Sequence, residues 1–118
     1  MATLAGGGAN GKIAMEVAEV VKRCKMALES YYGSQFKGLI LYGSVARDQA
    51  APASDIDLLV LLNQPFDYFR ELRRIVELLY PIQLESERLL SAKPALVDDF
   101  EHGVLALYRN ARREGVFV

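Results

Sequence analysis

The chain is poor in cysteine and histidine, and neither sign of charge dominates it. Its one cysteine, Cys24, excludes an intrachain disulfide and fits a reducing, cytoplasmic compartment. The chain has 14 Lys and Arg against 15 Asp and Glu, and it has no long basic run. We therefore expect no strong nucleic-acid-binding patch. No apolar segment approaches the length of a membrane span and no signal peptide is visible, so we expect no membrane association. The one histidine, His102, has no Cys or second His at ligand spacing and is interpreted as a surface residue.

What the chain has is the length and composition of one folded domain. Of its 118 residues 52% are hydrophobic and 25% are charged, and a chain of this size buries roughly 65% of its unfolded surface in one core. Residues 1–11, which are rich in glycine, are interpreted as a flexible leader. Residues 12–118 are interpreted as a single domain. Cys24 falls on the apolar stripe of a helical pattern, so we expect a core thiol and not a nucleophile.

Hydrophobic periodicity predicts helices mixed with strands. The predicted helices cover residues 12–32, about 66–80 and 97 to about 113, with a helical turn from 44 to about 49. Gly33 is expected to stop the first of them, and Pro81 to end or kink the second. The predicted strands cover residues 38–42, 56–62 and 88–95. The segment 56–62 is a nearly unbroken Val, Leu and Ile run, typical of a strand that is covered on both faces. We therefore expect a small α/β or α+β domain, with a mixed sheet of about three strands and helices packed on it.

Two aspartates lie two positions apart at the start of the buried strand. Side chains alternate along an extended backbone, so Asp55 and Asp57 face the same way while Ile56 points into the core. At about 4 Å and an effective dielectric near 20, two such carboxylates repel by roughly 4 kcal/mol. A divalent cation would remove that repulsion. The alternative to a cation site is that one aspartate caps the loop and the other has no role. Capping, however, requires only one carboxylate and leaves the second unexplained.

The surrounding residues resemble a known signature. Gly43-Ser44, Ala46-Arg47 and Ser54-Asp55-Ile56-Asp57-Leu58 are similar to the motif of the DNA polymerase beta-like nucleotidyltransferase superfamily, and closest to its minimal, antitoxin-like members. The resemblance implies a polymerase beta-like fold. It also implies metal-dependent transfer of a nucleoside monophosphate from an NTP, such as ATP, to an acceptor hydroxyl. Asp55 and Asp57 would then be the catalytic metal ligands, holding Mg²⁺ or Mn²⁺.

The same resemblance implies that Gly43, Ser44 and Arg47 bind the nucleotide. Gly43 would let the backbone approach the phosphates without a Cβ in the way. Ser44 would offer its hydroxyl and N–H at or near a helix N-terminus, and Arg47 lies one helical turn further on. The chain departs from the pattern at Asp48, where many relatives place glycine, and this departure bears on the shape of the following loop.

The third acid of the superfamily is not evident. Active members carry another carboxylate on the following strand, where it helps to deprotonate the attacking hydroxyl, and here the expected place in segment 89–92 holds a leucine. Glu87 or Glu85 could replace it, or both could belong to a solvated acidic edge. The gap supports a second hypothesis, a non-catalytic nucleotide-binding or antitoxin module. A purely structural subunit is a third.

The resemblance also implies a protein partner. Relatives are commonly paired with small helical HEPN-type proteins in toxin–antitoxin modules. The predicted domain takes up the chain beyond the leader, so we expect the acceptor to come from outside. Association with a HEPN-type protein, or with further copies of the chain as a homo-oligomer, is therefore expected.

Overall fold

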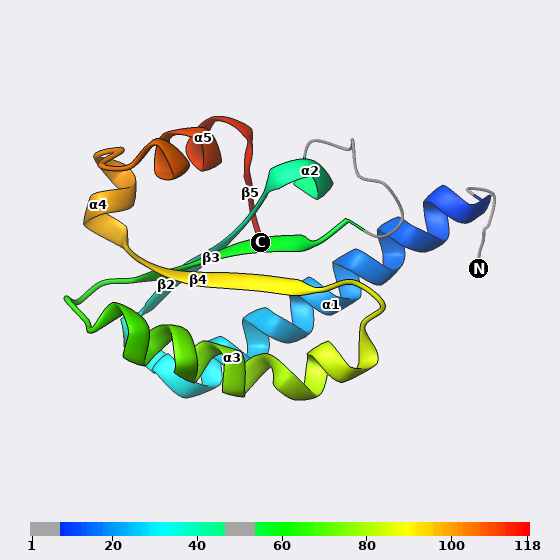
Figure 1. Cartoon of the computed structure of the whole chain (residues 1–118), viewed down its shortest axis with the longest axis horizontal. Helices are drawn as coiled ribbons and strands as arrows, with labels where there is room; N and C mark the ends of the chain where they lie inside the picture. Colours follow the sequence, from blue (N-terminus) through cyan, green and yellow to red (C-terminus); the bar gives the residue numbers. More distant parts are fainter. Residues whose placement is uncertain (1–7, 47–53) are drawn as a thin grey trace.

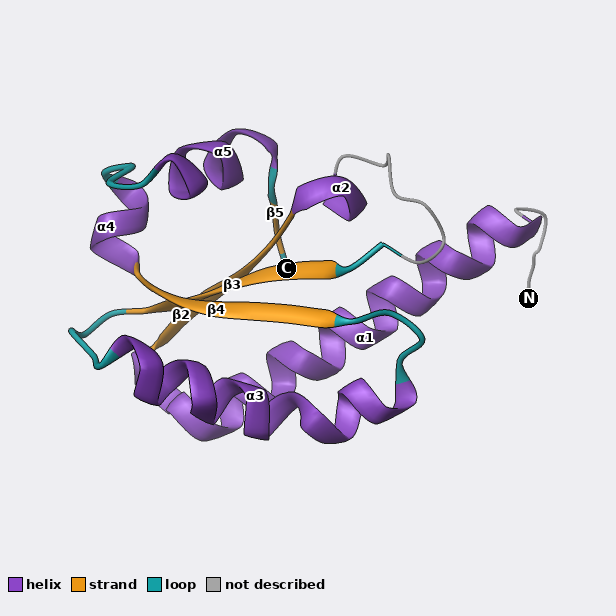
Figure 2. Cartoon of the chain, viewed as in Figure 1, coloured by secondary structure: helices purple, strands orange, loops and turns teal. Residues whose placement is uncertain are grey.

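The computed structural model describes residues 8–46 and 54–118, with side chains from residue 17 on. Figures 1 and 2 show a sheet between two layers of helices. Its strands are β2 (Phe36–Tyr42), β3 (Ile56–Leu62), β4 (Leu90–Leu96) and β5 (Val116–Phe117), in the spatial order β4-β3-β2-β5. β3 pairs parallel to β4 and antiparallel to β2, and β5 pairs antiparallel to β2. The expected mixed α+β class is confirmed, with a fourth strand that the sequence did not predict.

The helices cover the two faces of the sheet. α1 (Gly8–Tyr32) and α3 (Tyr68–Glu85) lie on one face, and α4 (Val97–Glu101) and α5 (Ala106–Glu114) lie on the other (Figure 1). The short α2 (Gly43–Ala46) follows β2 directly, and one turn of 3-10 helix (Gly33–Gln35) follows α1. No described helix combines the length and apolarity that crossing a membrane requires.

The centre of the core is β3, which is buried on both faces as predicted. Leu58 and Val60 pack on the α1 and α3 side, whereas Leu59 and Leu61 pack against Phe100 of α4 and its neighbours. Alternation along one strand therefore supplies both halves of the core. Cys24 is completely buried in α1, which confirms the core thiol, and burial raises its pKa to about 12.

The start of the chain follows the prediction with shifted boundaries. α1 begins at Gly8, four residues before the predicted start, and ends at Tyr32, where Gly33 has a φ of +57°. That backbone conformation suits glycine and stops the helix, as predicted. Residues 1–7 of the predicted leader and 47–53 of the predicted helical turn and loop lie outside the described residues.

The predicted end of the second helix at Tyr80 is wrong. α3 begins after the N-cap Asp67, whose side chain accepts a hydrogen bond from the Arg70 N–H, and continues through Pro81 to Glu85. Pro81 is solvent-exposed and Ile82 beyond it is buried, so packing of the last turn outweighs the hydrogen bond that proline removes. Residues 81–85, which were expected to connect the helix to the next strand, belong to α3. The strand consequently starts at residue 90 and not at residue 88.

The predicted single last helix is also wrong, because it is two helices. The helix is interrupted at Gly103, whose φ is +62°, between α4 and α5. Arg109 donates to the Gly103 carbonyl at 2.8 Å and Arg112 to the Glu101 carbonyl at 2.7 Å, so α5 satisfies the carbonyl of the last residue of α4 and one carbonyl of the break. His102 lies exposed in this break, which confirms its interpretation as a surface residue. Its ring N–H donates to the Asp98 carbonyl, and this hydrogen bond raises its pKa.

Candidate functional site

Three side chains form a row across the sheet at the level of Asp57. Asp57 on β3 is the register partner of Tyr42, the last residue of β2, and of Ser91 on β4. Register partners on neighbouring strands project from the same face of a sheet. Asp57 and Ser91 are both partly exposed, on the side of the sheet that α4 and α5 cover. The row therefore lies at the rim of that face, where β3 and β4 begin and β2 ends.

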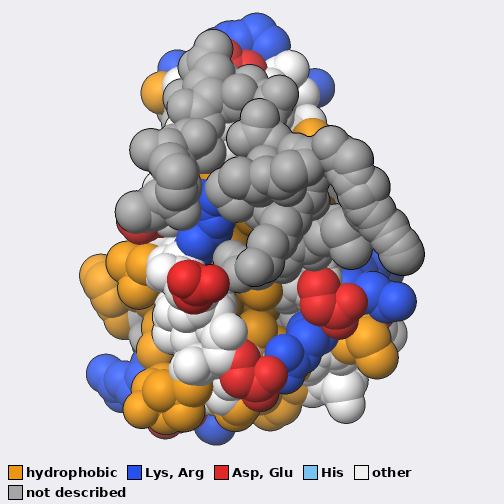
Figure 3. All heavy atoms as spheres, turned by 90° about the vertical axis from the view of Figure 1, so that its right-hand side faces the viewer, with side chains coloured by type: hydrophobic (Ala, Val, Ile, Leu, Met, Phe, Trp, Pro, Cys, Tyr) orange, Lys and Arg blue, Asp and Glu red, His pale blue; other side chains and the backbone are white. Residues whose placement is uncertain are grey.

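Asp55 lies at the entrance to β3. It directly precedes the strand and is exposed, whereas Ile56 is 1% exposed and packs in the core on the opposite face. The Ile56 N–H donates to the Leu89 carbonyl at 2.9 Å, which ties this entrance to the segment before β4. By strand alternation Asp55 and Asp57 point to the same side. Figure 3 views this end of the molecule and has acidic side chains on its surface.

The Gly-Ser turn touches the second aspartate. Gly43 has a φ of +78°, which favours glycine, and a Cβ built on it would lie 3.2 Å from Asp57 Cγ and 3.4 Å from Asp57 Cβ. Only glycine leaves room there for the Asp57 side chain. Ser44 follows in α2 and is partly exposed. The predicted neighbours Gly43, Ser44 and Asp57 are thus close in space, while Arg47 and Asp48 lie outside the described residues.

The predicted replacements for the third acid are not on β4. Glu85 is the last residue of α3, not a strand residue, and both of its carboxylate oxygens accept from the Arg23 guanidinium of α1, at 2.9 and 3.2 Å. This ion pair lowers the Glu85 pKa, mainly through the hydrogen bond and then through the charge of Arg23. Glu87 is exposed in the connection before β4.

The position beside Asp57 on β4 holds Ser91 and not the expected leucine. Two residues on, and therefore on the same face, lies Lys93, whose ammonium donates to Ser91 Oγ at 3.3 Å. Within the described part of the chain, no group of three or more His, Cys, Asp or Glu side chains could hold a metal ion. The described donor set is thus a pair of carboxylates, and such a pair suits Mg²⁺ when water and phosphate oxygens complete the shell.

A buried arginine that no sequence pattern indicated fixes the entrance to β3. Arg88 is 3% exposed, and its guanidinium donates to the carbonyl of Ser54, the residue before Asp55, at 2.9 Å. The Arg88 carbonyl accepts from Gln83 and Ser86, at 3.0 and 2.9 Å. Arg88 therefore links the end of α3 to the backbone that carries Asp55. Nothing in the sequence distinguishes it from the other arginines, because its burial depends on how α3 and β4 are connected.

Tyr42 is the polar neighbour of Asp57 on β2. Burial raises the pKa of Tyr42 to about 12, and the charge of Asp57 adds to the shift. The row across the sheet thus presents a phenol, a carboxylate and a serine hydroxyl, with the Lys93 ammonium beside the serine.

The contact between Gly43 and Asp57 leads to a prediction with a matched control. Gly33 also has a positive φ, but a Cβ there would meet nothing within 4 Å. Gly33→Ala should therefore cost only backbone strain, about 1–2 kcal/mol of unfolding free energy. Gly43→Ala should cost about 1–3 kcal/mol more, because the added methyl displaces Asp57. Urea unfolding of the two variants measures the difference, and equal losses would contradict the contact.

The chain is similar in sequence to known proteins over most of its length. The family described as "Nucleotidyltransferase domain" matches residues 21–114. Two proteins of Methanocaldococcus jannaschii are similar along most of their own length. "Putative protein adenylyltransferase MJ0604" is 35% identical over 67% of this chain and 83% of its own length. "Putative protein adenylyltransferase MJ0141" is 25% identical over 75% of this chain and 95% of its own.

Two solved structures share the fold. A crystal structure of a putative nucleotidyltransferase from Sulfolobus solfataricus aligns with a TM-score of 0.63 at 13% identity, over 98% of this chain and 90% of that one. A crystal structure of a toxin-antitoxin with AMP-PNP aligns with a TM-score of 0.50 at 16% identity, over 81% of this chain and 70% of that one. The family match spans most of the chain, and the M. jannaschii relatives agree with it. The chain belongs to the nucleotidyltransferase domain family.

Proposed function

We propose that this protein transfers AMP from ATP to a hydroxyl group of a protein, with a divalent metal ion held by Asp55 and Asp57. The observation that carries the proposal is the contact of the Asp57 side chain with Gly43, because it joins the carboxylate pair to the Gly-Ser turn. The names of the M. jannaschii relatives support an adenylyl group and a protein acceptor. The toxin-antitoxin of similar fold was crystallised with AMP-PNP, an analogue of ATP, which supports ATP as the donor.

The proposed mechanism assigns a task to each part of the site. Mg²⁺ or Mn²⁺, when bound, neutralises phosphate charge and orients the triphosphate. Gly43 lets the backbone of the turn lie against Asp57, and the Ser44 hydroxyl and N–H would donate to phosphate oxygens bound beside it. Arg47, which lies outside the described residues, keeps its expected role as a further phosphate ligand. Arg88 acts indirectly, by holding the Ser54 carbonyl and with it the backbone of Asp55.

In the reaction the acceptor oxygen forms a bond to the α-phosphorus of ATP. The bond from the α-phosphorus to the bridging oxygen breaks, and pyrophosphate leaves with the electron pair. The proton of the acceptor hydroxyl passes to solvent, since the face of β4 beside Asp57 offers Ser91 and Lys93 and no carboxylate. Positioning and charge neutralisation then supply most of the rate enhancement.

The same face of β4 favours one alternative. A chain with Ser91 in the place of a third acid could bind ATP without turning it over, as a nucleotide-binding or antitoxin module. The two functions differ in one measurable step, the release of pyrophosphate from labelled ATP in the presence of Mg²⁺ or Mn²⁺. Binding without release would favour the module.

An outside partner is part of the proposal. α3 carries a row of exposed apolar side chains on the surface away from the core: Phe69, Val76, Tyr80 and Leu84. Such a row is typical of a surface that packs against another helix. We therefore retain a helical HEPN-type protein, which would also be the acceptor, as the expected partner, and a homo-oligomer as its alternative. A cytoplasmic location stays a prediction.

The role of the carboxylate pair predicts the outcome of a neutral substitution. Asp57→Asn keeps the size of the side chain and removes its charge, so it should lower the rate of pyrophosphate release on the order of a hundredfold or more. Asp98→Asn, in the exposed first turn of α4, is the matched control and should leave the rate unchanged. A purely structural subunit would release no pyrophosphate in either form. In that case Asp57→Asn would only raise stability slightly, by relieving repulsion.

The partner is tested by sedimentation of the protein alone and in extract of the source cells. We expect a species heavier than the 13.1 kDa monomer in at least one of the two. Phe69→Asp, which places a charge on the α3 row, should reduce that species. A monomer under both conditions would contradict the partner.

A further inference from the structure

Lys93 is a positive side chain beside the carboxylate pair that the proposed mechanism has not used. It is the register partner of Leu59, two residues along from the Asp57–Ser91 pair, and is partly buried. Its ammonium reaches back along β4 to Ser91 Oγ at 3.3 Å. The charge therefore lies toward the rim of the sheet, where Asp57 contacts Gly43, and not toward the centre of the sheet.

The local balance of charge limits how many metal ions can bind. Asp55 and Asp57 together carry two negative charges, which one divalent ion neutralises. Phosphate oxygens complete the shell of that ion, but a second ion beside β4 would require a further protein carboxylate, and the described residues contain no group of three acids placed to provide it. A second ion would also lie close to the Lys93 ammonium, which repels it. A site with two carboxylates and one lysine thus suits one metal ion and one triphosphate.

We propose that Lys93 takes the place of a second metal ion: the protein binds a nucleoside triphosphate with a single divalent cation, and the Lys93 ammonium contacts the phosphate chain. This inference rests on the proposed function. Lysine is a flexible point charge and a common phosphate ligand. When phosphate is absent, Ser91 holds the ammonium in place. When a triphosphate is bound, its oxygens are the stronger acceptors, because they carry charge and Ser91 Oγ does not.

The inference is tested by binding, without reference to turnover. AMP-PNP is titrated calorimetrically in the presence of Mn²⁺, and bound Mn²⁺ is counted by electron paramagnetic resonance. The wild type should bind one Mn²⁺ for each AMP-PNP. Lys93→Met should weaken AMP-PNP binding about tenfold or more, while Lys93→Arg, which keeps the charge, should retain most of the affinity.

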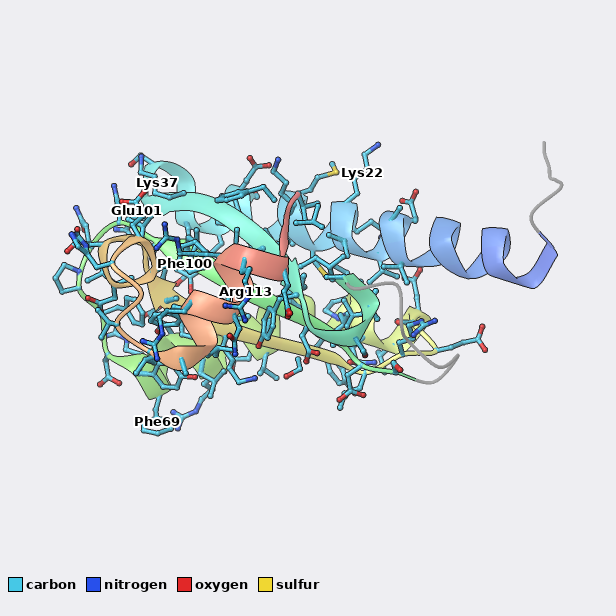
Figure 4. The ribbon with its side chains drawn as sticks, turned by 90° about the horizontal axis from the view of Figure 1, so that it is seen from above. Lys22, Lys37, Phe69, Phe100, Glu101 and Arg113 are labelled. Atoms are coloured by element: carbon cyan, nitrogen blue, oxygen red, sulfur yellow. The ribbon has the colours of Figure 1, made fainter. Side chains whose placement is uncertain are left out.

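Two further variants separate charge from structure. Lys37→Met is the control: Lys37 also lies on a strand, but at the end of the sheet away from α2 (Figure 4), and its loss should leave binding unchanged. Ser91→Ala removes the hydroxyl that accepts from Lys93 and keeps the Lys93 ammonium, so this variant should bind AMP-PNP nearly as the wild type does. A loss with Ser91→Ala as large as that with Lys93→Met would mean a structural role and overturn the inference.

The metal count gives an independent criterion. Ser91→Asp combined with Lys93→Ala adds a carboxylate beside Asp57 and removes the cation, so bound Mn²⁺ should rise from one to two for each AMP-PNP. Two Mn²⁺ in the wild type, or unchanged affinity with Lys93→Met, would overturn the role of Lys93 and leave the proposed function standing. A wild type that binds no AMP-PNP with Mn²⁺ would overturn both. Thermal unfolding of each variant confirms that the protein tested is folded.

Discussion

The proposed site depends on the close approach of the Gly43 backbone to the Asp57 side chain. This approach follows from the antiparallel pairing of β2 and β3, which makes Tyr42 and Asp57 register partners and puts the turn directly beside the acid. It also requires a residue without a Cβ at a φ of +78°. The pairing is in turn fixed by burial, since a one-residue slip of β3 would move Leu58 and Leu59 to the wrong faces of the sheet.

Much of this arrangement could be read from the sequence, because its determinants are local. β3 is an apolar run that only Asp57 interrupts, and the structure gives it the predicted bounds. Alternation fixed the opposite directions of Asp57 and Ile56, and Gly33 marked the end of α1. The Gly-Ser turn and the acid pair indicated the nucleotidyltransferase family, and the family match over residues 21–114 confirms it. Their individual roles in binding and catalysis remain predictions.

The errors occurred where tertiary contacts override local signals. Pro81 would end an isolated helix, but the buried Ile82 beyond it holds one more turn in place. That turn moves Glu85 onto α3, where Arg23 pairs with it, and removes it as a strand acid. The register of β4 then decides that Ser91 lies beside Asp57, and a parallel register cannot be deduced from one strand alone. The burial of Arg88 depends on the same connection, so it could not have been predicted either.

The charge around Asp57 connects the fold to the chemistry. A hydroxyl and an ammonium lie on the β4 side of the pair, and the carboxylates lie at the start of β3, so the charges of the proposed site suit one cation and an anionic chain of phosphates. The most direct measurement is a crystal structure with Mn²⁺ and AMP-PNP, with the manganese located by anomalous scattering. Our account predicts one manganese bound by both Asp55 and Asp57, with the phosphates over the Gly43-Ser44 turn. Carboxylates that diverge around an empty site, or phosphates bound away from the turn, would contradict it.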